Sequence, residues 1–247
     1  DDDSITVWDL SAVKVLHTFL TAQERLVERF LLEVRTLAAL ESRHVVRYRD
    51  AGRDDQRAWL VMQFAHGRTL AAMLREDGPL ALVPAVNLAA QVLEGLRDIH
   101  ALGLVHRDVK PANIVVGPDG RVLLLDLGIV RDNVGPRLTP GDLFVGTPEY
   151  APPEQILGQA VDDRTDLYAL AGVLYRMLTG RLPLPARTLR ETLFRHIGDV
   201  PVSPRVHDPA IPESLAAVVL RALDKDPQQR WSCAEQMRVA LLRAAGL

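Results

Sequence analysis

Oxygen-bearing side chains are concentrated in the segment 103–116, GLVHRDVKPANIVV, and shortly after it. Asp108 and Asn113 stand five residues apart before a short apolar run, and Asp126 follows thirteen residues after Asn113, at the end of the next run, in LLLDLG. If the two runs form a hairpin, the three side chains converge at its mouth. Carboxylate and amide oxygens bind Mg²⁺, and a carboxylate accepts the proton of a hydroxyl group, so this set suits phosphoryl transfer.

Each of these residues also has a purely structural interpretation. Asp and Asn side chains often hydrogen-bond to the backbone of their own turn, so Asp108 and Asn113 could simply close a turn before the strand. For any one residue taken alone, the turn is the better interpretation. The elements and motifs around the segment are therefore needed to choose between a turn and a reaction centre.

The elements that must position these side chains follow from hydrophobic periodicity. Alternation and β-branched residues predict strands at 11–16, 57–64, 113–116 and 121–126. Helical periodicity predicts helices at 21–40, 83–102, 165–179, 213–224 and 232–244. We therefore expect an α+β fold with a small strand-rich lobe at 1–64, a larger helical lobe at 65–247, and a ligand cleft between them.

Composition excludes several classes of protein. The 247 residues, 48% hydrophobic and 25% charged, are enough for a sizeable core, and a net charge of -3 gives no broad basic field for nucleic acid. The single cysteine, Cys233, excludes an internal disulfide and a multi-cysteine metal site, which suits a reducing, cytoplasmic compartment. No run of about eighteen apolar residues is present, so we expect no membrane segment.

Several motifs in order resemble those of protein kinases, in particular the bacterial Hanks-type serine/threonine kinases. His106-Arg107-Asp108 with Asn113 resembles the catalytic loop H-R-D-x-x-x-x-N, and Asp126-Leu127-Gly128 resembles the D-x-G metal motif. The resemblance extends along nearly the whole chain. It implies that Asp108 is the catalytic base, that Asn113 and Asp126 hold Mg²⁺, and that Lys110 balances charge on the phosphoryl group transferred from ATP. Lys110 also favours Ser/Thr protein substrates over Tyr.

The small lobe carries a second pair of charged residues. Glu33 falls on the apolar stripe of the predicted helix 21–40, where an acid needs a partner, and Lys14 lies nineteen residues earlier in the strand SAVKVL. This pattern is similar to the kinase pair of strand lysine and helix glutamate that positions the α- and β-phosphates. The alternatives are a lysine that protects a strand edge from aggregation and a glutamate at the rim of the lobe.

The same resemblance implies an adenine site. Met62 would be the gatekeeper, Gln63 to Ala65 would form the hinge whose backbone meets adenine, and Ala12 and Val115 would cover its two faces. Taken alone, each of these apolar residues would be ordinary core.

The segment 146–155, GTPEYAPPEQ, resembles the peptide-positioning end of a kinase activation loop, with Pro152-Pro153-Glu154 in place of the usual A-P-E. The resemblance implies an ion pair between Glu154 and Arg230 and a role for Asp166 in holding the catalytic-loop backbone. Glu154 and Asp166 could instead be surface charges, and Asp166 could be a helix cap.

Regulation is expected in the loop from Asp126 to Glu154. A phosphate is an anion that Arg107, beside Asp108, could bind, so phosphorylation of this loop is a natural switch. Thr139, in RLTPGD, is the better candidate for autophosphorylation, which a homodimer would allow. Thr147, in GTP, is expected to hydrogen-bond Asp108 and Lys110 instead.

One kinase feature is missing from the sequence. The Gly-rich loop should precede the lysine strand, yet the thirteen residues before Lys14 contain no glycine. We therefore expect an N-terminally truncated kinase domain with little activity by itself. A pseudokinase scaffold stays open, although the intact charged residues argue against it. A small-molecule kinase of the aminoglycoside type also stays open, and GTPEY with its paired Arg230 argues against that class.

Overall fold

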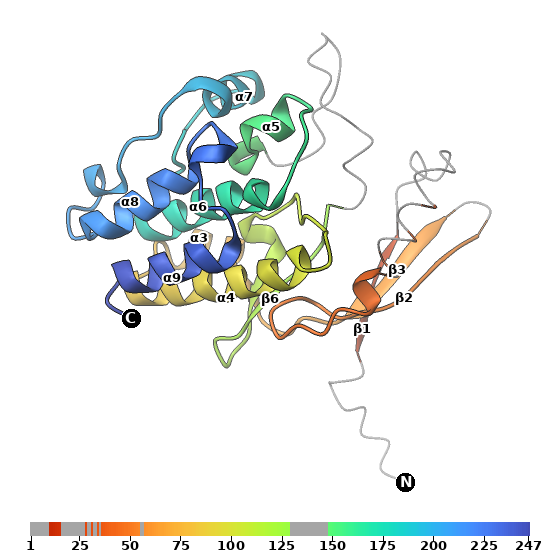
Figure 1. Ribbon diagram of the computed structural model, residues 1–247. Helices are drawn as coiled ribbons and strands as arrows, with labels where there is room; N and C mark the ends of the chain where they lie inside the picture. Colours follow the sequence, from red (N-terminus) through yellow and green to blue (C-terminus); the bar gives the residue numbers. More distant parts are fainter. Residues whose placement is uncertain are drawn as a thin grey trace.

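The structure, a computed structural model, describes residues 10–15, 28, 31, 34, 36–54, 57–128 and 148–247. These residues form a small lobe built on an antiparallel sheet and a larger, mainly helical lobe (Figure 1). The two-lobed α+β fold expected from the sequence is confirmed.

The sheet of the small lobe has the strand order β1-β3-β2, with β1 at Ser11–Val15, β2 at Tyr48–Arg53 and β3 at Ala58–Gln63. Strands β1 and β3 lie where alternation predicts them. Strand β2 has no counterpart among the predicted strands, because its sequence YRDAGR contains Asp, Gly and two Arg and has a low intrinsic strand preference. Its order comes from antiparallel pairing with β3.

The register of β1 on β3 decides which side chains face the large lobe. Ala12 lies opposite Met62, and Lys14 lies opposite Leu60. Residues directly opposite in an antiparallel pair point to the same face, so Ala12 and Lys14 share the face of Leu60 and Met62, which are only 3% and 7% exposed. Val13, on the other face, is 61% exposed.

The predicted helix 21–40 is described only in part. Residues 28, 31, 34 and 36–38 have helical backbone, and Val34 and Leu37 are buried. The stripe that periodicity predicts in this helix consists of Leu26, Phe30, Glu33, Leu37 and Leu40. Its first three residues lie outside the described residues.

A second sheet, in the order β4-β5-β6, belongs to the large lobe, with β4 at Arg68–Thr69, β5 at Ile114–Val116 and β6 at Val122–Leu124. Strands β5 and β6 form the predicted hairpin. The chain passes from β3 into this sheet through Gly67, whose φ is 145° and where a Cβ would collide with the carbonyl of Val116. Glycine is therefore required at the crossing between the lobes.

The helices of the large lobe are α3 at Leu70–Glu76, α4 at Leu82–His100, α5 at Pro153–Ile156, α6 at Asp163–Thr179, α7 at Leu189–Gly198, α8 at Glu213–Ala222 and α9 at Ala234–Ala244. Four of them, α4, α6, α8 and α9, lie at predicted positions. The short α3 and α5 and the polar α7 were not predicted from periodicity. None of the helices in the described ranges is both long enough and apolar enough to cross a membrane.

Helix α6 lies at the centre of the large lobe, and α4, α8 and α9 pack around it (Figure 1). It begins at the N-cap Asp162, whose side chain accepts from the Arg164 N–H, and ends at Gly180 with a φ of 70°. Helical periodicity puts Leu88, Val92, Leu96 and Ile99 on one face of α4, and all four are buried in this core. A rigid central helix of this kind is a firm support for the loops at its N-terminal end.

Candidate active site

Three of the predicted site residues form one cluster before β5. Lys110 Nζ lies 2.9 Å from Asp108 Oδ2. Asn113 Nδ2 donates to the same Oδ2 at 2.9 Å and to the Asp108 carbonyl at 3.0 Å. The bond to the carbonyl is the turn bond that the structural interpretation expects, so the same cluster also closes a turn. The Asp108 carboxylate is thereby held in a fixed orientation, with 11% of its side chain exposed.

Asp166, in the first turn of α6, holds the backbone of this loop from below. It is fully buried and accepts hydrogen bonds from the backbone N–H groups of His106 and Arg107, both at 2.8 Å. The predicted role of Asp166 is confirmed. The alternative of a helix cap is wrong, because the N-cap of α6 is Asp162.

His100, at the end of α4, is a partner of Asp166 that was not predicted. Its Nε2 lies 2.8 Å from Asp166 Oδ2. Burial alone would lower the pKa of His100, but the hydrogen bond and the charge of Asp166 outweigh it and raise the pKa. Burial would raise the pKa of Asp166, yet His100 and the His106 backbone keep it below its usual range. His100 and Asp166 thus each favour the charged form of the other, next to the backbone of the loop.

His106 has the opposite character. It is completely buried, and this burial lowers the pKa of its imidazole, which stays neutral. Its Nε2 donates to the Leu125 carbonyl at 2.8 Å, and its Nδ1 accepts from the Asp108 N–H at 3.3 Å. His106 thus joins the catalytic loop to the residue before Asp126.

Two non-glycine residues at this junction have left-handed backbone, Arg107 with a φ of 61° and Asp126 with a φ of 45°. Such conformations cost on the order of 1–3 kcal/mol each and persist only where the surroundings enforce them. The enforcing bonds here are Arg107 N–H to Asp166, Gly128 N–H to the His106 carbonyl at 2.7 Å, and Leu125 N–H to the Asn113 carbonyl at 2.8 Å. Both strained residues flank the cluster, as strained residues in reaction centres often do.

Lys14 and Asp126 bring the two lobes together. Lys14 Nζ lies 2.9 Å from Asp126 Oδ1, and the two side chains are 43% and 32% exposed. The Tyr48 hydroxyl on β2 accepts from the Leu127 N–H at 3.4 Å, and burial raises the pKa of Tyr48, which keeps the phenol neutral. Tyr48 was not predicted to lie at the site. Glu33, the predicted partner of Lys14, lies outside the described residues, so that pairing stays a prediction.

The residues predicted to surround adenine lie in both lobes. Ala12 and Met62 are cross-strand neighbours on the inner face of the small sheet. Gln63 is the last residue of β3 and donates its N–H to the Arg47 carbonyl at 2.8 Å, and Ala65 follows in the connection to β4. Val115, 4% exposed, lies in β5 of the large lobe.

The predicted ion pair of the peptide-positioning segment is confirmed. Helix α5 begins at Pro153, the position that tolerates proline best, with Pro152 extended before it. Glu154 then accepts two hydrogen bonds from Arg230, at 2.7 and 2.9 Å. Thr165 of α6 donates to the same carboxylate at 3.0 Å.

A pocket lies between this segment and the catalytic loop. Its lining includes Asp108, Lys110, Ala151, Pro152, Gln155 and Thr165. Gln155 Nε2 donates to the Arg107 carbonyl at 3.2 Å and so ties one wall to the other. Asp108 thus lines a pocket whose other wall comes from the segment 150–155.

Comparison with known proteins identifies the family. Residues 7–241 match the family model of the protein kinase domain. The chain belongs to the protein kinase domain family. This kinase domain is 38% identical over 244 residues to the serine/threonine-protein kinase PksC of Streptomyces coelicolor, covering 95% of this chain and 44% of that protein. It is 39% identical over 245 residues to the serine/threonine-protein kinase Pkn1 of Myxococcus xanthus, covering 97% of this chain and 35% of that protein.

Further comparisons agree. The kinase domain is 37% identical over 239 residues to the serine/threonine-protein kinase PknB of Mycolicibacterium smegmatis, covering 94% of this chain and 38% of that protein. The chain thus spans less than half the length of these curated relatives. Among solved structures, Rad53 1-466 in complex with AMP-PNP matches with a TM-score of 0.76 and 26% identity, over 92% of this chain and 56% of that chain.

Proposed function

We propose that this kinase domain transfers the γ-phosphoryl group of ATP to serine or threonine hydroxyls of protein substrates. The observation that carries the proposal is the Asp108 carboxylate, which Lys110 and Asn113 orient in a residue that lines the pocket beside the peptide-positioning segment. The curated relatives are named serine/threonine-protein kinases, which supports the same substrate class.

In this reaction Asp108 accepts the proton of the substrate hydroxyl. The hydroxyl oxygen forms a bond to the γ-phosphorus while the bond to the β,γ-bridging oxygen breaks, and ADP leaves. Lys110, 2.9 Å from Asp108, places a positive charge beside the oxygens of the transferring group. A general base of this kind contributes roughly 10²–10⁴-fold to the rate.

The residues proposed for Mg²⁺ fit its chemistry. Asn113 uses its Nδ2 to donate to Asp108, which leaves its amide oxygen for a metal, and Asp126 supplies a carboxylate. Within the described ranges no three His, Cys, Asp or Glu side chains are placed to hold a metal by themselves. Mg²⁺ usually takes one or two side-chain oxygens together with substrate phosphates, which matches this pair. When bound, the ion neutralises charge on the β- and γ-phosphates.

For ATP itself, we infer that Lys14 contacts the α- and β-phosphates with Glu33 as its partner. Lys14 lies at the boundary between the lobes, where it forms an ion pair with Asp126. We place adenine between Ala12 and Val115, next to Met62 and the backbone of Gln63 to Ala65. The similar structure of Rad53 1-466 is a complex with AMP-PNP, which supports an ATP-like ligand in this fold.

The decisive test compares the complete native protein with its Asp108→Asn variant. Labelled ATP and generic protein substrates measure phosphoryl transfer, and a separate titration measures nucleotide affinity. We expect Asp108→Asn to lower turnover by roughly 10²–10⁴-fold and to leave nucleotide affinity within about twofold, because the base and the binding residues have separate roles. Equal turnover in the two proteins would refute the assignment of Asp108. Nucleotide binding without any turnover in the parent would favour a pseudokinase scaffold.

We also propose that the active kinase autophosphorylates its activation loop at Thr139, within a homodimer. Thr139 lies outside the described residues, and its sequence context RLTPGD supports the proposal. Mass spectrometry of an active preparation should find phosphate on Thr139 and none in the Asp108→Asn variant. Phosphate at another position only, or none between residues 129 and 147, would contradict the proposal.

Two further inferences concern the lobes of the domain and its cellular location. We divide the domain into lobes at 1–64 and 65–247, since β3 ends at Gln63 and β4 begins at Arg68. We place the domain in the cytoplasm, because a single cysteine suits a reducing compartment. Limited proteolysis tests the first inference, and fractionation of native cells tests the second.

A further inference from the structure

The loop 41–47, which leads from the predicted helix 21–40 to β2, lies against the free edge of β6. Val46 N–H donates to the Leu124 carbonyl at 2.9 Å, and Leu124 N–H donates to the His44 carbonyl at 2.8 Å. Val45 forms a parallel bridge with Leu124. Strand β6 therefore has β5 on one side and this loop on the other.

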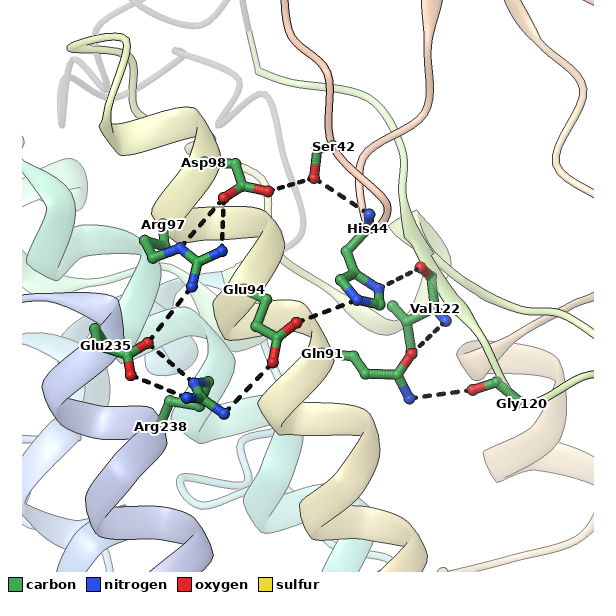
Figure 2. Close-up of polar contacts among 10 residues, drawn as sticks. All are labelled: Ser42, His44, Gln91, Glu94, Arg97, Asp98, Gly120, Val122, Glu235 and Arg238. Carbon is green, nitrogen blue, oxygen red and sulfur yellow. Dashed lines mark hydrogen bonds and ion pairs between the residues drawn. The ribbon is translucent and has the colours of Figure 1, made fainter.

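Side chains complete the same contact at the start of β6, as Figure 2 shows. The Val122 N–H donates to Gln91 Oε1 at 3.0 Å, and the Val122 carbonyl lies 3.2 Å from His44 Nδ1. Gln91 Nε2 donates in turn to the Gly120 carbonyl at 3.1 Å. Both polar backbone groups of Val122 are thus bound by side chains, one from α4 and one from the loop.

Glu94 fixes the ring of His44 from the other side. Its Oε2 lies 3.3 Å from His44 Nε2, and its Oε1 lies 3.4 Å from Arg238 of α9 (Figure 2). Both ring nitrogens of His44 therefore face acceptor oxygens, and the ring lies between the Val122 carbonyl and the Glu94 carboxylate. Arg238 is held in turn by Glu235, at 2.9 Å. We call His44, Gln91 and Glu94 the β6 clasp.

A glycine in the middle of α4 allows this close approach. A Cβ at Gly95 would lie 3.0 Å from the His44 carbonyl oxygen and 3.1 Å from Leu124 Cδ1. Glycine is a poor helix former, so its place in the helix next to Glu94 is explained by the nearness of the loop and β6. A side chain at position 95 would therefore push α4 away from the loop or from β6.

Strand β6 continues directly into the reaction centre. Leu125 binds Asn113 through its N–H and His106 through its carbonyl, each at 2.8 Å. Asp126 follows with its ion pair to Lys14. A shift of β6 along its axis would therefore move the metal-binding carboxylate proposed above and the catalytic loop together.

We propose that His44 is a positioning residue for phosphoryl transfer. Through the β6 clasp it holds the Val122 carbonyl, and so keeps Leu125 and Asp126 in register with Asn113 and His106. The proposal rests on the proposed kinase function. His44 touches no reacting atom, and its effect reaches the site through β6 alone.

A matched pair of variants in the complete native protein tests the proposal. In His44→Asn the amide nitrogen takes the place of Nδ1 and keeps the bond to Val122, whereas in His44→Gln it takes the place of Nε2 and keeps only the contact with Glu94. Hydrogen exchange of residues 121–128 is the first readout, and the KM for ATP at limiting Mg²⁺ is the second. We expect His44→Asn to stay within about twofold of the parent in both. In His44→Gln we expect hydrogen exchange of residues 121–128 to be at least about tenfold faster and the KM for ATP at least about tenfold higher, with the KM for the protein substrate unchanged. Gly95→Ala should change both readouts in the same direction.

Arg97→Gln is the control. Arg97 forms ion pairs with Asp98 and Glu235 at the outer part of the same network, and its side chain is half exposed. Its loss should therefore change neither readout. If His44→Gln fails to fold, Gln91→Met is the substitute variant. It removes the bond to the Val122 N–H and keeps a good helix former in α4, and it should give the same result.

Equal exchange of 121–128 in the Asn and Gln variants would overturn the proposal. Unequal exchange with equal kinetics would overturn the link to phosphoryl transfer. Hydrogen exchange needs no turnover, so a failure of the kinase function itself would show separately, as absent transfer in the parent.

Discussion

Arg230 and Glu154 form a bidentate ion pair inside the large lobe, with 0% and 4% of their side chains exposed. The remaining groups of the pair are also bound: Arg230 Nε donates to the Asp224 carbonyl at 2.8 Å, and Glu154 accepts from Thr165. A buried pair of this kind adds little net stability over apolar residues of the same shape, but the loss of one partner leaves an uncompensated charge. The pair therefore fixes the position of α5 relative to α6 and to the loop that precedes Arg230.

Removing one charge of this pair should destabilise the whole large lobe. We expect Glu154→Gln to lower the free energy of unfolding by about 3–5 kcal/mol, because Arg230 stays buried and charged. Glu191→Gln is the matched control, since Glu191 pairs with Arg195 at 2.7 Å on the exposed face of α7 and should cost less than about 1 kcal/mol. Chemical denaturation measures both. Similar losses in the two variants would contradict the role of the buried pair.

Lys14→Met should separate function from stability. The Lys14 and Asp126 side chains are partly exposed, so the ion pair contributes at most about 1 kcal/mol to folding. A charge-assisted contact with phosphate is worth more, and we expect kcat/KM for ATP to fall roughly 10- to 100-fold. Arg49→Met, on β2 with its bond to Ser11, is the control and should leave turnover unchanged. Turnover within twofold of the parent in Lys14→Met would remove Lys14 from the site.

His196 should make the fold sensitive to acid. It is buried beside Tyr168, whose hydroxyl lies 3.0 Å from Nδ1. Burial and the charge of Lys225 lower the pKa of His196 from 6.5 to about 4. Between these values the unfolded chain binds more protons, so the free energy of unfolding should fall by up to about 3 kcal/mol as the pH drops from 6.5 to 4. His196→Asn should flatten this part of the stability curve, and an unchanged slope would disprove the assignment.

His100 should have the opposite effect on the alkaline side. Its pKa is raised in the folded state by Asp166, so its contribution is complete below the unfolded pKa of about 6.5 and is lost as the pH rises through the raised value. His100→Gln keeps a donor but no charge, and its stability should vary less with pH above about 6.5. Urea titrations across this range compare the two proteins. A parent whose stability is flat there would show that Asp166 is not balanced by His100.

The core of the candidate site was predictable because its residues are close in sequence. Asp108, Lys110 and Asn113 come from one segment, and Asp126 ends the next strand, so a hairpin suffices to bring them together. Helices α4 and α6 were predictable for a similar reason, since a local stripe of apolar residues marks the buried face. Local order and local chemistry coincide here.

Other features of the fold and the site depend on tertiary contacts, which the local sequence pattern does not predict. Strand β2 is polar and forms because β3 pairs with it. His100 looks like any polar residue at a helix end, and only the packing of α4 on α6 shows that it meets Asp166. Glu94 and Arg238 look like ordinary helix surface charges, although they lie 3.4 Å apart across two helices. Such pairs are fixed by tertiary structure, and the sequence within each element is compatible with many partners.

The left-handed backbone of Arg107 and Asp126 has a consequence for protein engineering. Glycine adopts this conformation without steric cost, so Arg107→Gly and Asp126→Gly relieve strain in the folded chain. Both changes also delete a side chain that borders the proposed reaction centre. A selection for thermal resistance should therefore favour both glycine variants, whereas a selection for the proposed phosphoryl transfer should reject them.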